Sequence, residues 1–63
     1  MFTVQDLTVG DLVASMQLTV TEITPLPALL HGFRLYSVNG IGWDDNQMHS
    51  ITVPANRECE VWE

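Results

Sequence analysis

One cysteine and two histidines, Cys59, His31 and His49, are the residues of this chain best suited to catalysis. A Cys–His pair can act as nucleophile and base, but it also needs an orienting third group, an oxyanion hole and an enclosing pocket. A chain of 63 residues has little material to build such a pocket. Cys59 also alternates with Glu58 and Glu60, which is typical of a small buried residue in a strand. We therefore expect a structural cysteine and no enzymatic activity.

Two adjacent aspartates, Asp44 and Asp45, are followed by Asn46, and all three carry oxygen atoms that could hold a metal ion. An EF-hand calcium loop has acids at alternating positions and ends on a bidentate glutamate, and this stretch has neither feature. Adjacent side chains of extended backbone point to opposite sides, so both rarely reach one ion. The glycines of "NGIG" also lack the GxGxxG spacing of a phosphate-binding loop. The sequence predicts a solvated turn here, with no metal and no cofactor.

The charge balance is acidic, with a formal net charge of −6 and only two strong cations, Arg34 and Arg57. Nucleic acids and anionic membranes both bind proteins through several lysines or arginines on one face. No apolar run approaches the roughly 20 residues of a membrane span, and the N-terminus has no signal-peptide pattern. We expect a cytoplasmic protein that binds neither nucleic acid nor a membrane.

The length allows one domain, spanning residues 1–63. A domain this small buries only about 60% of the surface that its unfolded chain exposes, so its stability is expected to be marginal. A lone cysteine excludes an internal disulfide, and Cys and His are not paired as a structural zinc site requires. We therefore expect self-association, as a homo-oligomer, to supply the missing stability.

Apolar and polar residues alternate with period two between closely spaced turn residues, which predicts an all-β domain. Before the first long strand, Thr3 and Asp6 have capping-box spacing for at most one helical turn. Residues 9–11 are expected to form a turn in which Gly10 takes positive φ. In the strand that follows, Leu18 and Val20 lie on one face. Thr19, Thr21 and Ile23 lie on the other face.

Pro25 and Pro27 lack the backbone N–H that a central strand needs, so they disfavour one at this point. Pro27 instead predicts a short helical or 3-10 turn near residues 27–31, with Gly32 as the residue that ends it. The next strand covers residues 33–38. If Phe33 and Leu35 face the core, Tyr36 and Val38 face outward.

Asn39-Gly40, between apolar strand residues, is the strongest local signal and predicts a two-residue type I′ hairpin. A short strand then reaches Trp43 and ends in a turn at residues 44–47. His49, beside this turn, is expected to be an ordinary exposed residue. Two further strands follow, separated by a turn at "PANR". Their expected inward residues are Ile51, Val53, Cys59 and Val61, with Trp62 outward.

About five short antiparallel strands predict a small barrel, which also removes exposed sheet edges. An open meander of the same strands is the alternative. The "VGD" turn, the long loop, the Asn-Gly hairpin and the strand after "TVPANR" together resemble an SH3-like small β-barrel. The chain also resembles short proteins encoded by bacteriophages of high-GC hosts. These resemblances imply a fold and the cytoplasm of a host cell, and they carry no binding residues over.

Several aromatic and apolar residues are expected on the surface, where such side chains mark interaction sites and dominate binding energy. The tryptophans either meet a partner or cap an open end of the barrel. The segment at 26–30 is either a lid over the barrel or a contact segment. Acidic residues at the rim favour a partner with a basic surface. The candidate protein-binding residues are Leu26, Leu29, Leu30, Tyr36, Trp43, Asp44, Asp45 and Trp62.

These observations lead to two hypotheses from different classes. The first is a non-catalytic protein-binding module that self-associates. With the resemblance to phage-encoded proteins, this module is a phage factor that binds and modulates a host protein. The second is a small structural or assembly component, in a virion or a homo-oligomer, with no host target. Recovery of one stoichiometric host protein would separate the two.

Overall fold

Antiparallel strands make up most of this protein, whose computed structural model describes residues 2–62. One 3-10 helix, η1, accompanies them. The elements in chain order are β1 (Phe2–Thr3), η1 (Val4–Asp6), β2 (Leu12–Val13), β3 (Leu18–Leu30), β4 (Phe33–Gly42), β5 (Met48–Pro54), β6 (Glu58–Cys59) and β7 (Val61–Trp62).

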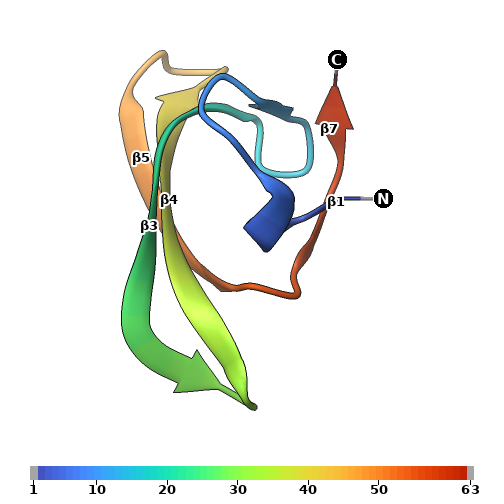
Figure 1. Ribbon diagram of the computed structural model, residues 1–63. Coiled ribbons are helices and arrows are strands. Elements are labelled where there is room, and N and C mark those ends of the chain that lie inside the picture. The colour runs from blue at the N-terminus through green and yellow to red at the C-terminus, as the bar shows by residue number, and fades with distance from the viewer. Residues whose placement is uncertain (1, 63) are drawn as a thin grey trace.

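The strands form a five-stranded antiparallel sheet in the order β5-β4-β3-β2-β7 and a two-stranded sheet of β1 and β6. The larger sheet curves around η1, and the long β3–β4 hairpin projects away from both chain ends (Figure 1). The expected all-β class is confirmed. Among residues 2–62 no pairing joins β5 to β7, so the sheet is not a closed barrel.

The core is built mainly of valines, which suit a pleated surface because their branched side chains are stiff. Its members come from both sheets and from η1, which places Val4 fully out of contact with solvent. A capping box holds η1 in place: the backbone N–H and the hydroxyl of Thr3 both lie 3.0 Å from Asp6 Oδ2, as expected. The buried residues of this cluster are Val4, Leu7, Val13, Leu18, Val20, Val38, Val53 and Cys59.

The β3–β4 connection differs from the expected one. The turn lies at His31 and Gly32, whose φ angles of 50° and 84° are both positive, as a two-residue type I′ hairpin requires. Leu30 and Phe33 pair on either side of it. Asn39-Gly40 is therefore not a turn, and this prediction was wrong: both residues lie inside β4.

Gly40 is needed at its position for a different reason. A Cβ added there would lie 2.6 Å from Leu18 Cδ1 and 2.6 Å from the backbone oxygen of Thr19. The glycine lets the backbones of β3 and β4 sit against the Leu18 side chain without a clash. The Asn-Gly pair was interpreted as a turn, whereas Gly40 is required because β3 and β4 pack closely at this position.

The helical turn expected near residues 27–31 is also absent, because β3 continues through both prolines to Leu30. From Glu22 onward β3 pairs only with β4, so within residues 2–62 nothing pairs with its other edge. A strand with a free edge tolerates proline, and the register shifts between Pro25 and Leu29. The prolines therefore mark an edge rather than the end of the strand.

The side-chain faces of β3 and β4 also differ from expectation. A register shift between Val20 and Glu22 carries Ile23 to the side of Leu18 and Val20, where it packs against the core. In β4, Val38 is fully buried and Tyr36 packs against the core, whereas Phe33 is 46% exposed. The expected assignment was inverted, since a one-residue change of phase exchanges the two faces of a strand.

The remaining local expectations hold. Gly10 has a φ of 98° in the turn before β2, and its N–H donates to the backbone oxygen of Val20. In β5, Val53 is buried and Ile51 packs against the core, as predicted. The C-terminal strand is interrupted at Glu60, and Cys59 and Val61 on either side of it turn inward.

Candidate protein-binding surfaces

Trp43 and Trp62 form an aromatic pair, with ring centroids 5.1 Å apart and planes tilted by 33°. The two residues are 19 positions apart in the sequence and lie on different elements: Trp43 follows β4, and Trp62 ends β7. Trp43 is fixed further by two hydrogen bonds. Its indole Nε1–H donates to Thr19 Oγ1 at 3.1 Å, and its backbone N–H donates to the Gln17 oxygen at 2.9 Å.

Strand register explains why the indoles meet. Leu12 in β2 pairs with Thr19 on one side and with Trp62 on the other. Paired residues point to the same face of a sheet, and the neighbouring Val13 points into the core. Leu12, Thr19 and Trp62 therefore share the outer face, and Trp43 joins them through its bond to Thr19.

We call Leu12, Trp43 and Trp62 the tryptophan patch. Their exposed fractions are 37%, 36% and 54%, which leaves a large part of each side chain accessible. The sequence predicted Trp43 and Trp62 as contact residues but did not predict that they touch. Leu12 was missed, although it precedes the buried Val13 in a two-residue strand and so must face outward.

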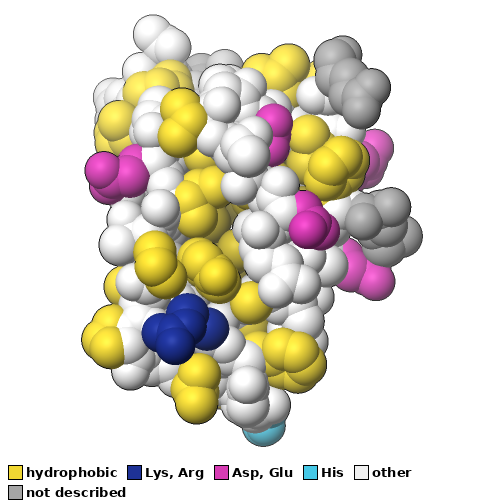
Figure 2. Space-filling model, viewed as in Figure 1, with side chains coloured by type: hydrophobic (Ala, Val, Ile, Leu, Met, Phe, Trp, Pro, Cys, Tyr) yellow, Lys and Arg dark blue, Asp and Glu magenta, His cyan; other side chains and the backbone are white. Residues whose placement is uncertain are grey.

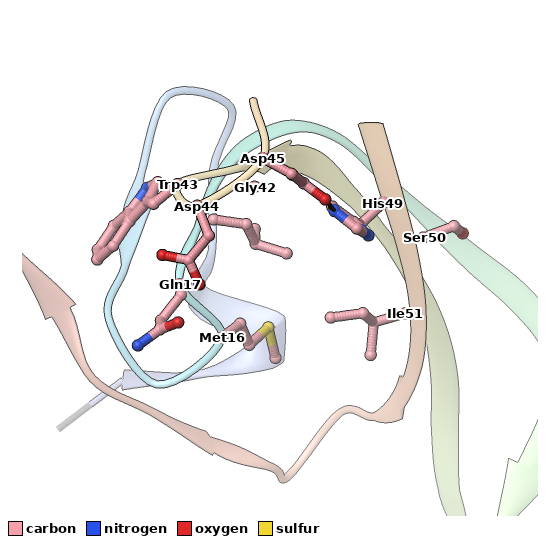
Figure 3. A pocket seen from close by; sticks show the side chains of 10 residues that line it. Met16, Gln17, Gly42, Trp43, Asp44, Asp45, His49, Ser50 and Ile51 are labelled. Atoms are coloured by element: carbon pink, nitrogen blue, oxygen red, sulfur yellow. Dashed lines mark hydrogen bonds and ion pairs between the residues drawn. The ribbon is translucent and has the colours of Figure 1, made fainter. Parts of the chain in front are cut away.

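A pocket of about 290 Å³ adjoins Trp43. It is open to solvent and lies between β5 and two turns, the first at residues 14–17 and the second at residues 43–45 (Figure 3). The backbone bond from Trp43 to Gln17 ties these turns together. The lining residues are Met16, Gln17, Leu18, Gly42, Trp43, Asp44, Asp45, His49, Ser50 and Ile51.

Asp45 and His49 are hydrogen-bonded at this pocket, with His49 Nε2 2.8 Å from Asp45 Oδ2. Asp45 Oδ1 also accepts the backbone N–H of Gln47 at 3.0 Å. The Gln47 hydrogen bond, and after it the bond to His49, lowers the pKa of the Asp45 carboxyl below its usual 3.8. His49 is exposed, as expected, but the pairing across the turn was missed.

Gly42 leaves room for this pair, because a Cβ there would lie 2.7 Å from Asp45 Oδ1 and 2.8 Å from His49 Cδ2. The two side chains therefore lie over the backbone of β4 at its last residue. Asp44, in contrast, accepts no hydrogen bond among the described residues. The two adjacent aspartates have separate roles: Asp45 holds the turn, and Asp44 stays free.

A second apolar surface lies at the far end of the molecule. We call Leu29, Leu30 and Phe33 the hairpin tip; they are 65%, 45% and 46% exposed. Leu30 pairs with Phe33 on one face, and Leu29 pairs with Arg34 on the other. Hydrophobic side chains are spread over the face in view, whereas the basic side chain lies in its lower half and the acidic side chains lie above it (Figure 2).

Arg34 connects the tip to the rest of the molecule. Its Nη1 donates to the Leu26 oxygen at 2.9 Å, and its own backbone oxygen accepts the Ala55 N–H at 2.8 Å. Leu26 is partly buried, while the residues nearer the turn are exposed. The segment at 26–30 is therefore a strand of the projecting hairpin and not a lid over the sheet.

The candidate residues thus fall into two places. The structure brings Trp43, Asp44, Asp45 and Trp62 together at one end. Leu26, Leu29 and Leu30 lie on the hairpin at the other end. Tyr36, expected to face outward, packs against the core and belongs to neither surface.

Three further findings concern Cys59, metal ligands and membrane-spanning helices. Cys59 is 4% exposed, and burial raises the pKa of its thiol, so it is placed as a structural residue would be. Across residues 2–62, no three His, Cys, Asp or Glu side chains group closely enough to hold a metal ion. Within the same range no helix has the length and apolar character to cross a membrane.

Comparisons of the chain with protein-family models, curated proteins and solved structures found no match. The fold defines the class directly: an all-β domain with an open five-stranded antiparallel sheet and a two-stranded sheet. Its two exposed surfaces, one aromatic and acidic and the other apolar, are the features that bear on function.

Proposed function

We propose that this protein is a non-catalytic protein-binding module, and the exposed tryptophan pair is the observation that carries the proposal. Tryptophan is among the residues that dominate binding energy, especially where it is clustered. Here the stack and the bond to Thr19 hold Trp43 in one orientation before any partner arrives. A side chain that is already ordered loses less entropy on binding, so a fixed aromatic makes an efficient anchor.

The partner we propose carries a basic surface. The chain has a net charge of −6, and Asp44 and Asp45 lie beside the tryptophan patch. Charges of this kind steer a complementary partner and disfavour an acidic one. If the chain is encoded by a phage, as its resemblance implies, the partner is a host protein in the host cytoplasm, whose activity the binding modulates.

For the fold, we propose an opened SH3-like barrel. Strands β2 to β5 form a consecutive antiparallel meander, and the C-terminal β7 returns to pair with β2. Pairing of β5 with β7 would close this sheet. The connection supports the resemblance, although the two edge strands stay apart.

Affinity purification from the native host cell tests the binding function. The wild-type chain is expected to recover one stoichiometric protein, and Trp62→Ala is expected to weaken its binding by roughly 30-fold, the effect of a 2 kcal/mol hot spot. Val9→Ser is the matched control, because Val9 is 69% exposed and lies outside both surfaces. Equal recovery by wild type, Trp62→Ala and Trp43→Ala would contradict the assignment of the site.

A structural role in which the chain binds only itself is the second candidate, and the hairpin tip favours it. Three apolar side chains at the end of a two-stranded projection suit burial against another copy. Sedimentation at micromolar concentration is expected to show an oligomer that Leu30→Ser dissociates. A strict monomer would rule out this role, whereas an oligomer without any recovered host protein would favour it over the first.

A further inference from the structure

We propose that the pocket beside Trp43 binds an arginine side chain presented by a partner protein. This inference rests on the proposed binding function and names the chemistry that the site recognises. It is carried by the size of the pocket, by the types of its lining residues and by the charge around it.

The size of the pocket selects a single side chain. Its volume of about 290 Å³ is at the lower limit of the roughly 300–1,000 Å³ typical of small-molecule sites. A nucleotide or a larger cofactor exceeds this volume. A long, unbranched side chain fits within it, provided that its stem and its head find suitable surroundings.

The lining supplies two kinds of surroundings. Met16, Leu18 and Ile51 supply apolar lining for methylene groups. Trp43 and Asp44 lie beside each other, across the pocket from Ile51 (Figure 3). Long cationic side chains bury their stems on apolar surface and keep the charged head near polar groups. An indole attracts a cation to its ring, and a carboxylate accepts its N–H groups.

The free carboxylate decides where the cation sits. Asp45 already accepts hydrogen bonds from Gln47 and pairs with His49. Asp44, on the adjacent residue, has no such partner among residues 2–62, so its oxygens remain available to a ligand. A guanidinium group can donate to Asp44 and stack on Trp43 at once, because it is planar and carries several donors. A lysine ammonium is a compact point charge and cannot stack in this way.

The aromatic wall is built before the ligand arrives. Trp62 packs on Trp43 but does not line the pocket, so it supports the indole from outside. The bonds to Thr19 and Gln17 fix the ring and the backbone of Trp43. A second copy is a poorer source of the cation, because the chain has only two arginines and a net charge of −6.

Titration of the ¹⁵N-labelled protein with N-acetyl-arginine methylamide tests the proposal by NMR. We expect saturable shifts, in the millimolar range, of the Trp43 Nε1–H and of backbone signals at Gln17 and Asp44. The citrulline analogue has nearly the same shape without the charge and is expected to shift these signals far less. Equal shifts with citrulline, or an equally tight lysine analogue, would overturn the assignment of a guanidinium site.

Two charge variants sharpen the test. Asp44→Asn keeps the size of the side chain and is expected to weaken arginine binding about three- to fivefold, the effect of one partly exposed ion pair. Glu58→Gln removes one negative charge from β6, outside the pocket, and is the matched control. Equal weakening by both variants would show that net charge, and not the pocket, attracts the ligand.

The outcomes separate this proposal from the binding function itself. If arginine binding fails but the partner is still recovered and lost in Trp62→Ala, the pocket assignment is wrong and the binding module stands. If the Trp43 signal shifts with protein concentration alone, a second copy fills the pocket and a foreign arginine is excluded. If arginine binds as expected but Asp44→Asn leaves partner recovery unchanged, the partner does not use the pocket and the proposal fails.

Discussion

The two ends of this molecule both expose apolar side chains, but they hold them differently. At the tryptophan patch, Trp43 is fixed by a ring contact to Trp62 and a hydrogen bond to Thr19. At the hairpin tip, Leu29 and Leu30 extend from a strand whose outer edge is free. The first surface is supported by three strands of the sheet, whereas the second is supported by its own hairpin and by one hydrogen bond from Ala55 to Arg34.

This difference follows from where the core lies. β4 runs through both ends, yet only its second half, with Val38 and Gly40, is buried. The β5 strand accompanies β4 only as far as Leu35, so the tip lacks a third strand to pack against. We expect changes near the patch to affect both folding and binding, whereas changes to the exposed side chains of the tip should affect binding and leave folding almost unchanged. Four predictions test this contrast.

The largest effect is expected from alanine in place of the buried glycine of β4. Gly40→Ala places a methyl group 2.6 Å from Leu18 Cδ1 and from a backbone oxygen, which should cost at least about 2 kcal/mol of unfolding free energy. Gly32→Ala at the tip meets open space but has a φ of 84°, which should cost about 1 kcal/mol. Urea denaturation followed by tryptophan fluorescence measures both. A smaller loss for Gly40→Ala than for Gly32→Ala would contradict the contrast.

These two glycines also show how much of the fold the sequence could predict. The all-β class, the capping box, the turn at Gly10 and the inward residues of β5 follow from local patterns, and the structure confirms them. The position of the hairpin turn does not follow from local patterns. Asn-Gly and His-Gly are both acceptable turn pairs, and only packing distinguishes them. Gly40 is held by a contact with Leu18, 22 residues away, which no local pattern reveals.

The candidate site was predicted in part, for the same reason. Exposed aromatics and acids near residues 43–45 are visible in the sequence. The contact of Trp43 with Trp62 depends on β7 pairing with β2, a choice of neighbour that alternation does not specify. The Asp45–His49 pair had a usable signal, since an acid and a histidine four residues apart flank a predicted turn.

The next effect in size concerns the tryptophan pair. An aromatic contact of this kind is worth about 0.5–1.5 kcal/mol beyond the area that it buries. In a double-mutant cycle with Trp43→Ala and Trp62→Ala, we expect a coupling energy in this range in the unfolding free energy. If the losses of unfolding free energy in the two single variants simply add in the double variant, the two rings do not support each other. The side chains of the patch would then be held no more firmly than those of the tip.

A smaller effect is expected from acid. The pKa of Asp45 is lowered in the folded protein, so its contribution to stability is present above pH 3.8 and is lost as the pH falls through the lower, folded value. Asp45→Asn should therefore be less stable than wild type at neutral pH, and the difference should shrink in strong acid. Denaturation midpoints across the acid range measure it. Asp44→Asn is the control, and it should lose stability in acid as wild type does, because Asp45 is still present. If the stability difference between Asp45→Asn and wild type did not change with pH, the charge of Asp45 would have no such role.

The smallest effect on stability is expected at the hairpin tip, and it is the most informative one for function. Leu29 is 65% exposed and pairs only with Arg34, so Leu29→Ser should change the unfolding free energy by no more than about 0.5 kcal/mol. If the tip binds another molecule, the same variant should lower oligomer formation or partner recovery while its urea midpoint stays at the wild-type value. A large loss of stability would show that the tip is packed in solution, and its apolar side chains would then have a structural role instead of a binding role.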